Sequence, residues 1–391
     1  MNLSSWLSCA GVLCLVVGCF DLAQARTIRV ELDGSGDTTS LETAELQASP
    51  GDTIQIGPGT WNEDYTWSTL DGQVVQALLG VNTDSLTIRG AGEGLTILGI
   101  DDGDRSRFGI TIREDVSALV VEDLVIRGMS SALANRGGAI SLERVAMEHS
   151  LNGVLISTGS MSAFDCRFVD IQGRGIPVLG ATEFVRVASS EFTRVEIAIQ
   201  VNPAIYAEVA ECTFADCGAG IIADGATIDV DRVAMTNVQQ ALTVRRPSGV
   251  LNVTSAEVHG VGFAAVFCTN GAYANVVSSS FTDTVGPAIV LEIGAVMQMN
   301  DCDIIPRHDE DFIRVSSYPD EPVTVFNFEN NYWGTTDRQE IANRIKDGND
   351  PPPNPAVTIH AVVDFEPFQL LPVSNEDQSF GGFKGRFRQD N

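Results

Sequence analysis

Short apolar strands recur along this chain with a period of 21 to 24 residues. In each period, small or polar residues lead into an apolar residue that closes a short strand, as in "AECTF" and "DVDRVAM". The closing residues are Ile126, Met147, Phe168, Phe192, Phe214, Met235, Val258, Phe281 and Ile304. A second short apolar strand follows each of them and a third opens each period, whereas helical periodicity is absent.

Three short strands per period, separated by Gly, Asn and Asp turns, are typical of a right-handed parallel β-helix, in which each period forms one coil stacked on the next. The pattern therefore predicts an all-β fold, a single right-handed parallel β-helix of about eleven or twelve coils. Equivalent residues of successive coils lie about 4.8 Å apart and form ladders along the axis. The closing residues should point inward, with Phe168, Phe192, Phe214 and Phe281 stacked.

The cysteines fit these ladders. Cys166, Cys212 and Cys302 each stand two places before a closing residue. Cys166 and Cys212 are two coils apart, about 9.6 Å, which is beyond the reach of a disulfide. Cys212 and Cys217 could be free buried thiols, form a disulfide or bind a metal ion. No further ligands stand at the spacing of a metal site, which favours free buried thiols. We expect all five cysteines after residue 25 to be free.

The N-terminal part predicts a cap over the open end of the helix. Ser40 is placed to cap a short amphipathic helix over 41–48, and the first strand is expected at 53–56. A helix across this end prevents edge pairing with a second molecule. The stretch 30–61, with "DGSG" and "GDTI" followed by "GTW", resembles the opening of pectin methylesterases and other β-helix proteins, with and without activity. This resemblance implies architecture rather than chemistry.

The C-terminal part breaks the period of the coils. We expect a turn at Asn330-Asn331, a helix over 337–346 capped by Thr336, and a last strand over 357–364. The block 329–368, with "NNYWGTTD" and "VDFEPF", resembles the closing cap of secreted bacterial right-handed β-helix repeat proteins of the pectin lyase-like fold. The expected domains are a signal peptide over 1–25, the β-helix with its caps over 26–372, of which 329–372 is the closing cap, and a disordered tail over 373–391.

Charge and the first residues narrow the function classes. The chain has 24 Lys and Arg against 52 Asp and Glu, a formal net charge of −28, which excludes nucleic acid and disfavours bare acidic polysaccharide as partners. Residues 1–25 contain a short apolar run followed by Ala23-Gln24-Ala25, as in a secretory signal peptide. The residues before Cys19 weakly resemble a lipoprotein cleavage site, so a lipid anchor at Cys19 is an alternative. We expect a secreted, periplasmic or cell-surface protein, a monomer without a transmembrane segment after the signal peptide.

Two acidic turns are candidate sites. The turn "GIDDGD" would bind calcium through Asp101, Asp102 and Asp104, because carboxylate oxygens on a glycine turn suit this ion; the alternative is a solvated turn. The turn "RHDED" gathers the residues of a candidate surface site, for which the alternative is a turn that only lengthens its coil. These residues are His308, Asp309, Glu310 and Asp311.

A catalytic constellation is not evident. Residues 82–84, 101–102 and 344–346 resemble three of the four signature pieces of polygalacturonase-like hydrolases, but the Gly-His-Gly piece is absent and the others fall too many coils apart to converge. We expect no acid, base and cation to meet on one face. The favoured function is an exported, non-catalytic β-helix protein with a carbohydrate- or protein-contacting face. The alternative is a polysaccharide-active enzyme, lyase-like or hydrolase-like, with an unrecognised site.

Overall fold

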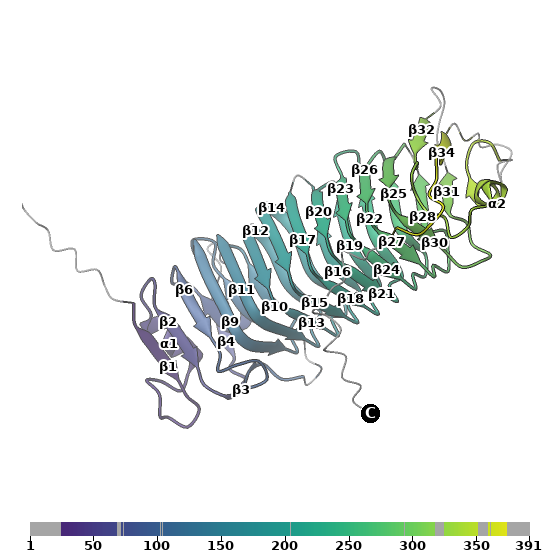
Figure 1. Ribbon diagram of the computed structural model, residues 1–391. Coiled ribbons are helices and arrows are strands. Elements are labelled where there is room, and N and C mark those ends of the chain that lie inside the picture. Colours follow the sequence, from purple (N-terminus) through teal and green to yellow (C-terminus); the bar gives the residue numbers. More distant parts are fainter. Residues whose placement is uncertain are drawn as a thin grey trace, which may run out of the picture.

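The computed structural model describes residues 25–68, 72, 74–101, 103, 105–203, 205–292, 294–316, 324–350, 359 and 361–373. The chain winds into an elongated parallel β-solenoid of about 12 turns, with helix α1 (Leu41–Gln47) at one end and helix α2 (Arg338–Asn343) at the other (Figure 1). The predicted right-handed parallel β-helix and its number of coils are confirmed. The signal peptide, Cys19 and residues 374–391 lie outside the described residues.

The coils in the body of the solenoid each contribute one strand to each of three parallel stacks, which we call stacks 1, 2 and 3 in the order in which the chain meets them within a coil. Stack 1 consists of β1 (Thr27–Val30), β2 (Thr53–Ile56), β6 (Leu86–Arg89), the first parts of β9 (Ala118–Arg127) and β11 (Ala139–Glu148), the last parts of β12 (Asn152–Phe164) and β14 (Arg174–Ala188), β17 (Tyr206–Ala210), β20 (Thr227–Asp231), β23 (Val250–Thr254), β26 (Tyr273–Val277), β29 (Val296–Asn300), β32 (Thr324–Asn327) and β34 (Ala361–Asp364).

Stack 2 is made of shorter strands. They are β3 (Gly59–Trp61), β7 (Thr96–Leu98), the last parts of β9 and β11, β13 (Arg167–Val169), β15 (Glu191–Thr193), β18 (Thr213–Ala215), β21 (Ala234–Thr236), β24 (Glu257–His259), β27 (Ser280–Thr282) and β30 (Asp303–Ile305).

Stack 3 completes each coil. It holds β5 (Val74–Val81), β8 (Phe108–Ile112), β10 (Ser131–Asn135), the first parts of β12 and β14, β16 (Ile197–Val201), β19 (Ala219–Asp224), β22 (Gln240–Arg245), β25 (Ala264–Thr269), β28 (Ile289–Glu292), β31 (Ile313–Ser316) and β33 (Ile345–Lys346). Among the described strands, only β4 (Tyr65–Ser68) pairs antiparallel, with β5.

The nine closing residues of the sequence pattern form one continuous ladder through stack 2, as predicted. The rings of Phe168 and Phe192 stack with centroids 4.6 Å apart, and those of Phe192 and Phe214 with centroids 4.9 Å apart. Phe281 is also buried, but Val258 and Ile304 are its ladder neighbours. The predicted stack therefore holds three phenylalanines rather than four.

Left-handed backbone conformations turn the corners on both sides of stack 2. The residues three places before the closing positions of the nine coils all have φ between 49° and 60°: Asp123, Arg144, Asp165, Ser189, Glu211, Arg232, Ser255, Ser278 and Asp301. A second such row follows the closing residues, where the Asp170 N–H donates to the Thr193 carbonyl oxygen of the next coil at 3.1 Å. One residue thus redirects the chain without breaking the hydrogen bonding between coils.

All five cysteines of the described chain are free and buried, as predicted. The Sγ of Cys212 donates to the Ala210 carbonyl oxygen at 3.2 Å, and Cys217 lies in the next inward ladder, between Val195 and Val238. Burial raises the pKa of the Cys217 thiol, and it raises the pKa of each of the other four thiols to about 12. These side chains fill the wall of the solenoid.

We expect the five thiols to resist alkylation in the native protein, because the thiolate is the reactive form and burial disfavours it. In a chain that starts after residue 25, denaturation without reductant should then expose five thiols to iodoacetamide. Mass spectrometry counts the adducts. Fewer than five would reveal a disulfide that the structure lacks.

The N-terminal cap differs from the prediction in two details: α1 ends at Gln47, and Thr53–Ile56 is the second strand, because Thr27–Val30 pairs with it as β1. Ser40 is the N-cap of α1, and its Oγ accepts a hydrogen bond from the Thr43 N–H. Leu41 and Ala44 bury the inner face of the helix over the first coils. Glu45 is also buried, and its Oε1 accepts the backbone N–H groups of Asn82 and Thr83 at 2.8 and 2.9 Å, which ties the cap to the coil beneath it.

The C-terminal cap differs from the prediction in detail. Asp337, rather than Thr336, is the N-cap of α2, and its Oδ1 accepts the Gln339 N–H at 2.8 Å. The helix ends at Asn343, because Ile345–Lys346 leave it and pair with β31 as one more rung of stack 3. The last strand is described over Ala361–Asp364.

Candidate functional site

One row of outward positions in stack 3 is largely buried and contains no titratable side chain, whereas two residues further along Asp224 lies in register with Arg245. The residues of this row in register are Pro177, Gln200, Ile222, Thr243, Phe267 and Val290, and the row becomes charged only at Arg314. A general acid or base needs a titratable group within reach of the substrate. This row offers none over six successive coils.

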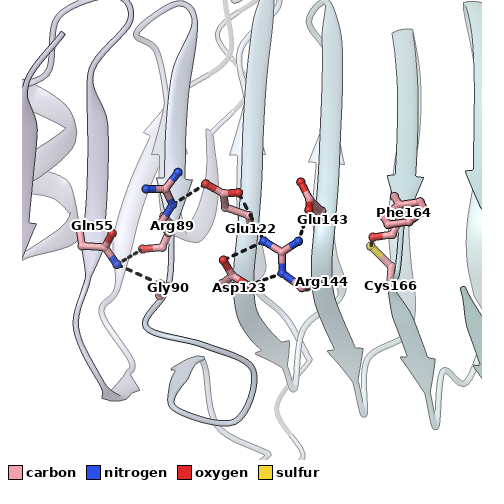
Figure 2. A network of polar contacts seen from close by, with 9 residues as sticks. All are labelled: Gln55, Arg89, Gly90, Glu122, Asp123, Glu143, Arg144, Phe164 and Cys166. Carbon is pink, nitrogen blue, oxygen red and sulfur yellow. Dashed lines mark hydrogen bonds and ion pairs between the residues drawn. The ribbon is translucent and has the colours of Figure 1, made fainter. Parts of the chain in front are cut away.

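Charged side chains near the N-terminal end of stack 1 neutralise one another (Figure 2). Arg89 Nε lies 2.5 Å from Glu122 Oε1, and Arg144 Nε lies 2.6 Å from Asp123 Oδ1. The hydrogen bond from Arg144 holds the pKa of the Asp123 carboxyl below its usual value. Arg144 also contacts Glu143. This network ties neighbouring coils together and leaves Asp123 ionised.

A second group of charges lies on the outer face of stack 2 and its corner. Arg167 Nη2 lies 2.9 Å from Glu93 Oε1 and 3.1 Å from Glu148 Oε1. His149 Nδ1 lies 3.6 Å from Asp101 Oδ2 and 3.9 Å from an oxygen of Asp170. Arginines, carboxylates and a histidine do therefore meet on one face, contrary to the expectation from sequence. Aligning the repeat copies on their closing residues would have revealed this group, because its members occupy neighbouring ladder positions.

The charges of this group are largely paired. Arg194 Nε lies 2.6 Å from Asp170 Oδ1, and this hydrogen bond lowers the pKa of the Asp170 carboxyl. A catalytic acid generally requires a raised pKa, so Asp170 is poorly suited to that role.

The same face contains a small hollow three to four coils further along. Its volume is about 260 Å³, and its polar lining includes Thr236, Glu257, His259, Ser280 and Thr282. His259 Nδ1 lies 3.0 Å from Thr282 Oγ1. Ligand pockets usually enclose about 300–1,000 Å³, so the hollow lies just below the usual size of such pockets.

Stack 1 presents two regular rows of side chains on its outer face, which we together call the ladder face. The polar row, in direct register, is Arg186, Glu208, Asp229, Asn252, Asn275 and Gln298. The stacking row, two residues earlier in the same strands, is Phe184, Tyr206, Thr227, Val250, Tyr273 and Val296. The strands that carry them lie side by side along the solenoid (Figure 1). These rows are not evident from the sequence, because the outward positions share a register but no common residue type.

Hydrogen bonds order the centre of the ladder face. The Tyr206 hydroxyl donates to Asp229 Oδ2 at 2.6 Å, and Asn252 Nδ2 donates to Asp229 Oδ1 at 2.7 Å. The bond to Asp229 raises the pKa of the Tyr206 hydroxyl, which therefore stays protonated at neutral pH. The Phe184 ring stacks on the Tyr206 ring with centroids 5.9 Å apart.

Further along, the rows are less constrained. The Tyr273 hydroxyl donates to Gln298 Oε1 at a long 3.4 Å. The Asn275 side chain makes no hydrogen bond within the described part of the chain and is half-buried on the outer face. Its amide can offer both a donor and an acceptor to a ligand.

Of the predicted calcium ligands, Asp101 is partly exposed and lies beside His149, as described above. Asp102 and Asp104 lie outside the described residues, so the complete turn is not seen. The described residues include no group of three or more His, Cys, Asp or Glu side chains placed to hold a metal ion.

In the second predicted turn, His308 and Asp309 are almost fully exposed and 3.2 Å apart. Asp311 instead pairs with Arg314 at 2.9 Å. Arg344 holds the turn from the C-terminal cap, because its Nε donates to the Glu310 carbonyl oxygen at 2.8 Å. The turn thus has a structural role in docking the cap.

The hydrolase-like pieces also have structural roles. Asn82 and Thr83 bind Glu45 of the N-terminal cap, and Asp84 Oδ1 accepts the Ser117 N–H at 2.7 Å. Arg344 follows α2 at the other end of the solenoid. They do not converge, as expected from their spacing.

Comparison with known proteins gives distant structural similarity and no closer relationship. No protein-family profile and no curated sequence matches this chain. Among solved structures it is similar to the A-module of a mannuronan C-5 epimerase from Azotobacter vinelandii (13% identity, 80% of this chain and 90% of the other, TM-score 0.45). It is also similar to the catalytic domain of a GH87 alpha-1,3-glucanase (8% identity, 75% and 68%, TM-score 0.43) and to a pectate lyase (12% identity, 76% and 78%, TM-score 0.36).

The register of the three stacks defines a right-handed parallel β-helix. Identities of this size say nothing about activity, since one fold supports many functions. No helix among the described residues is long and apolar enough to cross a membrane.

Proposed function

We propose that this chain is an exported, non-catalytic β-helix protein that binds carbohydrate along its ladder face. The observation that carries the proposal is the polar row, in register over six coils, beside a row in which three of the six residues are aromatic. Amides and carboxylates bind sugar hydroxyls, which both donate and accept hydrogen bonds, while tyrosine and phenylalanine offer flat apolar surfaces to sugar rings.

Two further features support this proposal. The row from Pro177 to Val290 in stack 3 lacks titratable groups, and Asp170, in the charged group on stack 2, has a lowered carboxyl pKa. The apolar run and Ala23-Gln24-Ala25 near the N-terminus favour export to the periplasm or cell surface, with a lipid anchor at Cys19 as a variant of that location.

Replacing Tyr206 by alanine should weaken binding to a glycan about tenfold, through loss of the ring surface and of the hydroxyl that orders Asp229. A glycan array identifies the ligand, and calorimetry on purified protein measures the affinity. Phe263→Ala is the matched control, because this exposed phenylalanine lies away from stack 1. Equal losses in both variants, or no binding to any glycan, would rule out the proposal.

A polysaccharide-active enzyme is the second candidate, and the charged group on the outer face of stack 2 is the observation that favours it. Arg167 and His149 are its best candidates for a cation and a base. Incubating the protein with plant, algal and bacterial polysaccharides and measuring new reducing or unsaturated ends tests this directly. Cleavage that Arg167→Ala abolishes, in a variant with unchanged circular dichroism, would establish the enzyme and reject the non-catalytic function.

We further propose that the turn over 99–104 binds calcium through Asp101, Asp102 and Asp104. Gly99 and Gly103 have φ of 89° and 83°, and carboxylate oxygens next to glycines in the sequence suit calcium. Millimolar calcium should raise the melting temperature when sodium at equal ionic strength does not, and Asp101→Asn with Asp102→Asn should remove the increase. A melting curve that ignores calcium would reject this site.

A further inference from the structure

The ladder face carries an excess of negative charge. In its polar row, Glu208 and Asp229 are carboxylates, and Arg186 is the cation of the row. Arg186 Nε lies 3.6 Å from Glu208 Oε2, so its charge is already offset. At the end of β20 the charge of Asp231 is offset in the same way by Arg232, so the excess negative charge of the face resides on Asp229. A polyanionic chain would meet repulsion here, within a protein of net charge −28.

The polar groups match uncharged hydroxyls instead. Asp229 is held by Tyr206 on one oxygen and by Asn252 on the other, and each oxygen keeps a second lone pair for a hydroxyl proton. Asn275, which is free of partners within the described residues, supplies both a donor and an acceptor. Such paired groups recognise neutral polar ligands without releasing counterions.

The shape of the face selects an extended ligand. Consecutive rungs of a parallel stack are about 4.8 Å apart, so the five steps from Arg186 to Gln298 cover about 24 Å in a nearly straight line. The stacking row follows the same line, from Phe184 and Tyr206 to Tyr273. A helically coiled chain would leave this line after a few units, whereas an extended ribbon would stay in contact with both rows.

We infer that the ladder face binds an uncharged, extended polysaccharide that lies along the axis of the solenoid. This inference rests on the proposed carbohydrate-binding function and adds the class of ligand. It assigns the central contacts to Tyr206, Asp229 and Asn252 and the distal contacts to Tyr273 and Asn275. A longer ligand is bound more tightly until it spans the whole face.

The test measures the binding of three probes by calorimetry on the chain from residue 26 to 391. Cellohexaose is neutral and extended, maltohexaose is neutral and coiled, and oligogalacturonate is anionic and extended. We expect cellohexaose to bind at least tenfold more tightly than the other two, and more tightly than cellotriose. Tyr206→Ala and Asn275→Ala should each weaken the binding of cellohexaose, whereas Phe263→Ala should leave it unchanged. Added sodium chloride should not change the affinity for cellohexaose, because no ion pairs form with this ligand.

The outcomes separate the inference from the function on which it rests. Oligogalacturonate or maltohexaose bound as tightly as cellohexaose, with loss in Tyr206→Ala, would overturn the ligand class and leave a carbohydrate-binding ladder face. Binding that all ladder-face variants retain would move the site elsewhere and overturn the inference. Absence of binding to these probes and to every glycan of an array would overturn the function itself and turn attention to a protein partner.

Discussion

Replacing Phe192 by alanine is expected to lower the free energy of unfolding by about 3–5 kcal/mol. Phe192 is fully buried, and its ring stacks between those of Phe168 and Phe214 at 4.6 and 4.9 Å. Truncation removes both ring contacts and leaves a cavity that neighbouring coils cannot close, because hydrogen bonds hold the coils in fixed register. Gly175 lies against this ring, where a Cβ would approach it to 3.2 Å, so the backbone is fitted to the phenyl group.

Equilibrium unfolding in guanidinium chloride, followed by circular dichroism, measures this loss. Phe164→Ala is the matched control, because the Phe164 side chain is 52% exposed, and it should change the free energy of unfolding by less than about 0.5 kcal/mol. A loss below about 1 kcal/mol for Phe192→Ala would show that the ladder of closing residues does not face the core.

Replacing Asn331 by alanine should have a comparable effect, about 3 kcal/mol or more, through unsatisfied backbone groups. Asn331 is fully buried in the C-terminal cap. Its Oδ1 accepts the Cys302 N–H at 2.9 Å, and its Nδ2 donates to the carbonyl oxygens of Met299 and Phe328, both at 2.8 Å. The side chain thus ties the last coils to the cap, where it occupies the place that the Ser190 and Ser279 hydroxyls have in the body of the solenoid.

The same denaturation experiment tests this prediction, with Asn343→Ala as the control because Asn343 is exposed at the end of α2. We expect Asn331→Ala to unfold the last coils first, and limited proteolysis should then cut near the cap before the body. If both asparagine variants were equally stable, the side chain of Asn331 would not be what closes the solenoid.

Much of the fold could be predicted from inward positions. The closing residues, the ladder of Cys166, Cys212 and Cys302, and the capping helix after Ser40 agree with the structure because each inward residue meets an equivalent residue one coil away. This repeated environment imposes similar residues at a fixed period. Asn331 was recognised only as a turn residue, yet Asn330 has the left-handed φ of 61° and the Asn331 side chain makes the buried contacts.

The corners and outer faces could not be predicted in the same way. Arg144, Glu211 and Arg232 occupy left-handed positions where Gly, Asn or Asp would be expected. Hydrogen bonds between coils compensate this strain, and they exist only once the coils are stacked. Lys346 was predicted to be helical, but pairing with Arg314 of β31 makes it a strand residue.

The sequence by itself determined the coil, its period and the residues that fill it, because burial against the neighbouring coil restricts each inward position to similar apolar side chains. Only the tertiary structure decided which outward side chains become neighbours. Tyr206, Asp229 and Asn252 are separated by more than twenty residues at each step, and the charged group around His149 is equally scattered. Exposure to solvent does not restrict such positions to one residue type. Which of their side chains interact is therefore known only once the stacking of coils places them side by side.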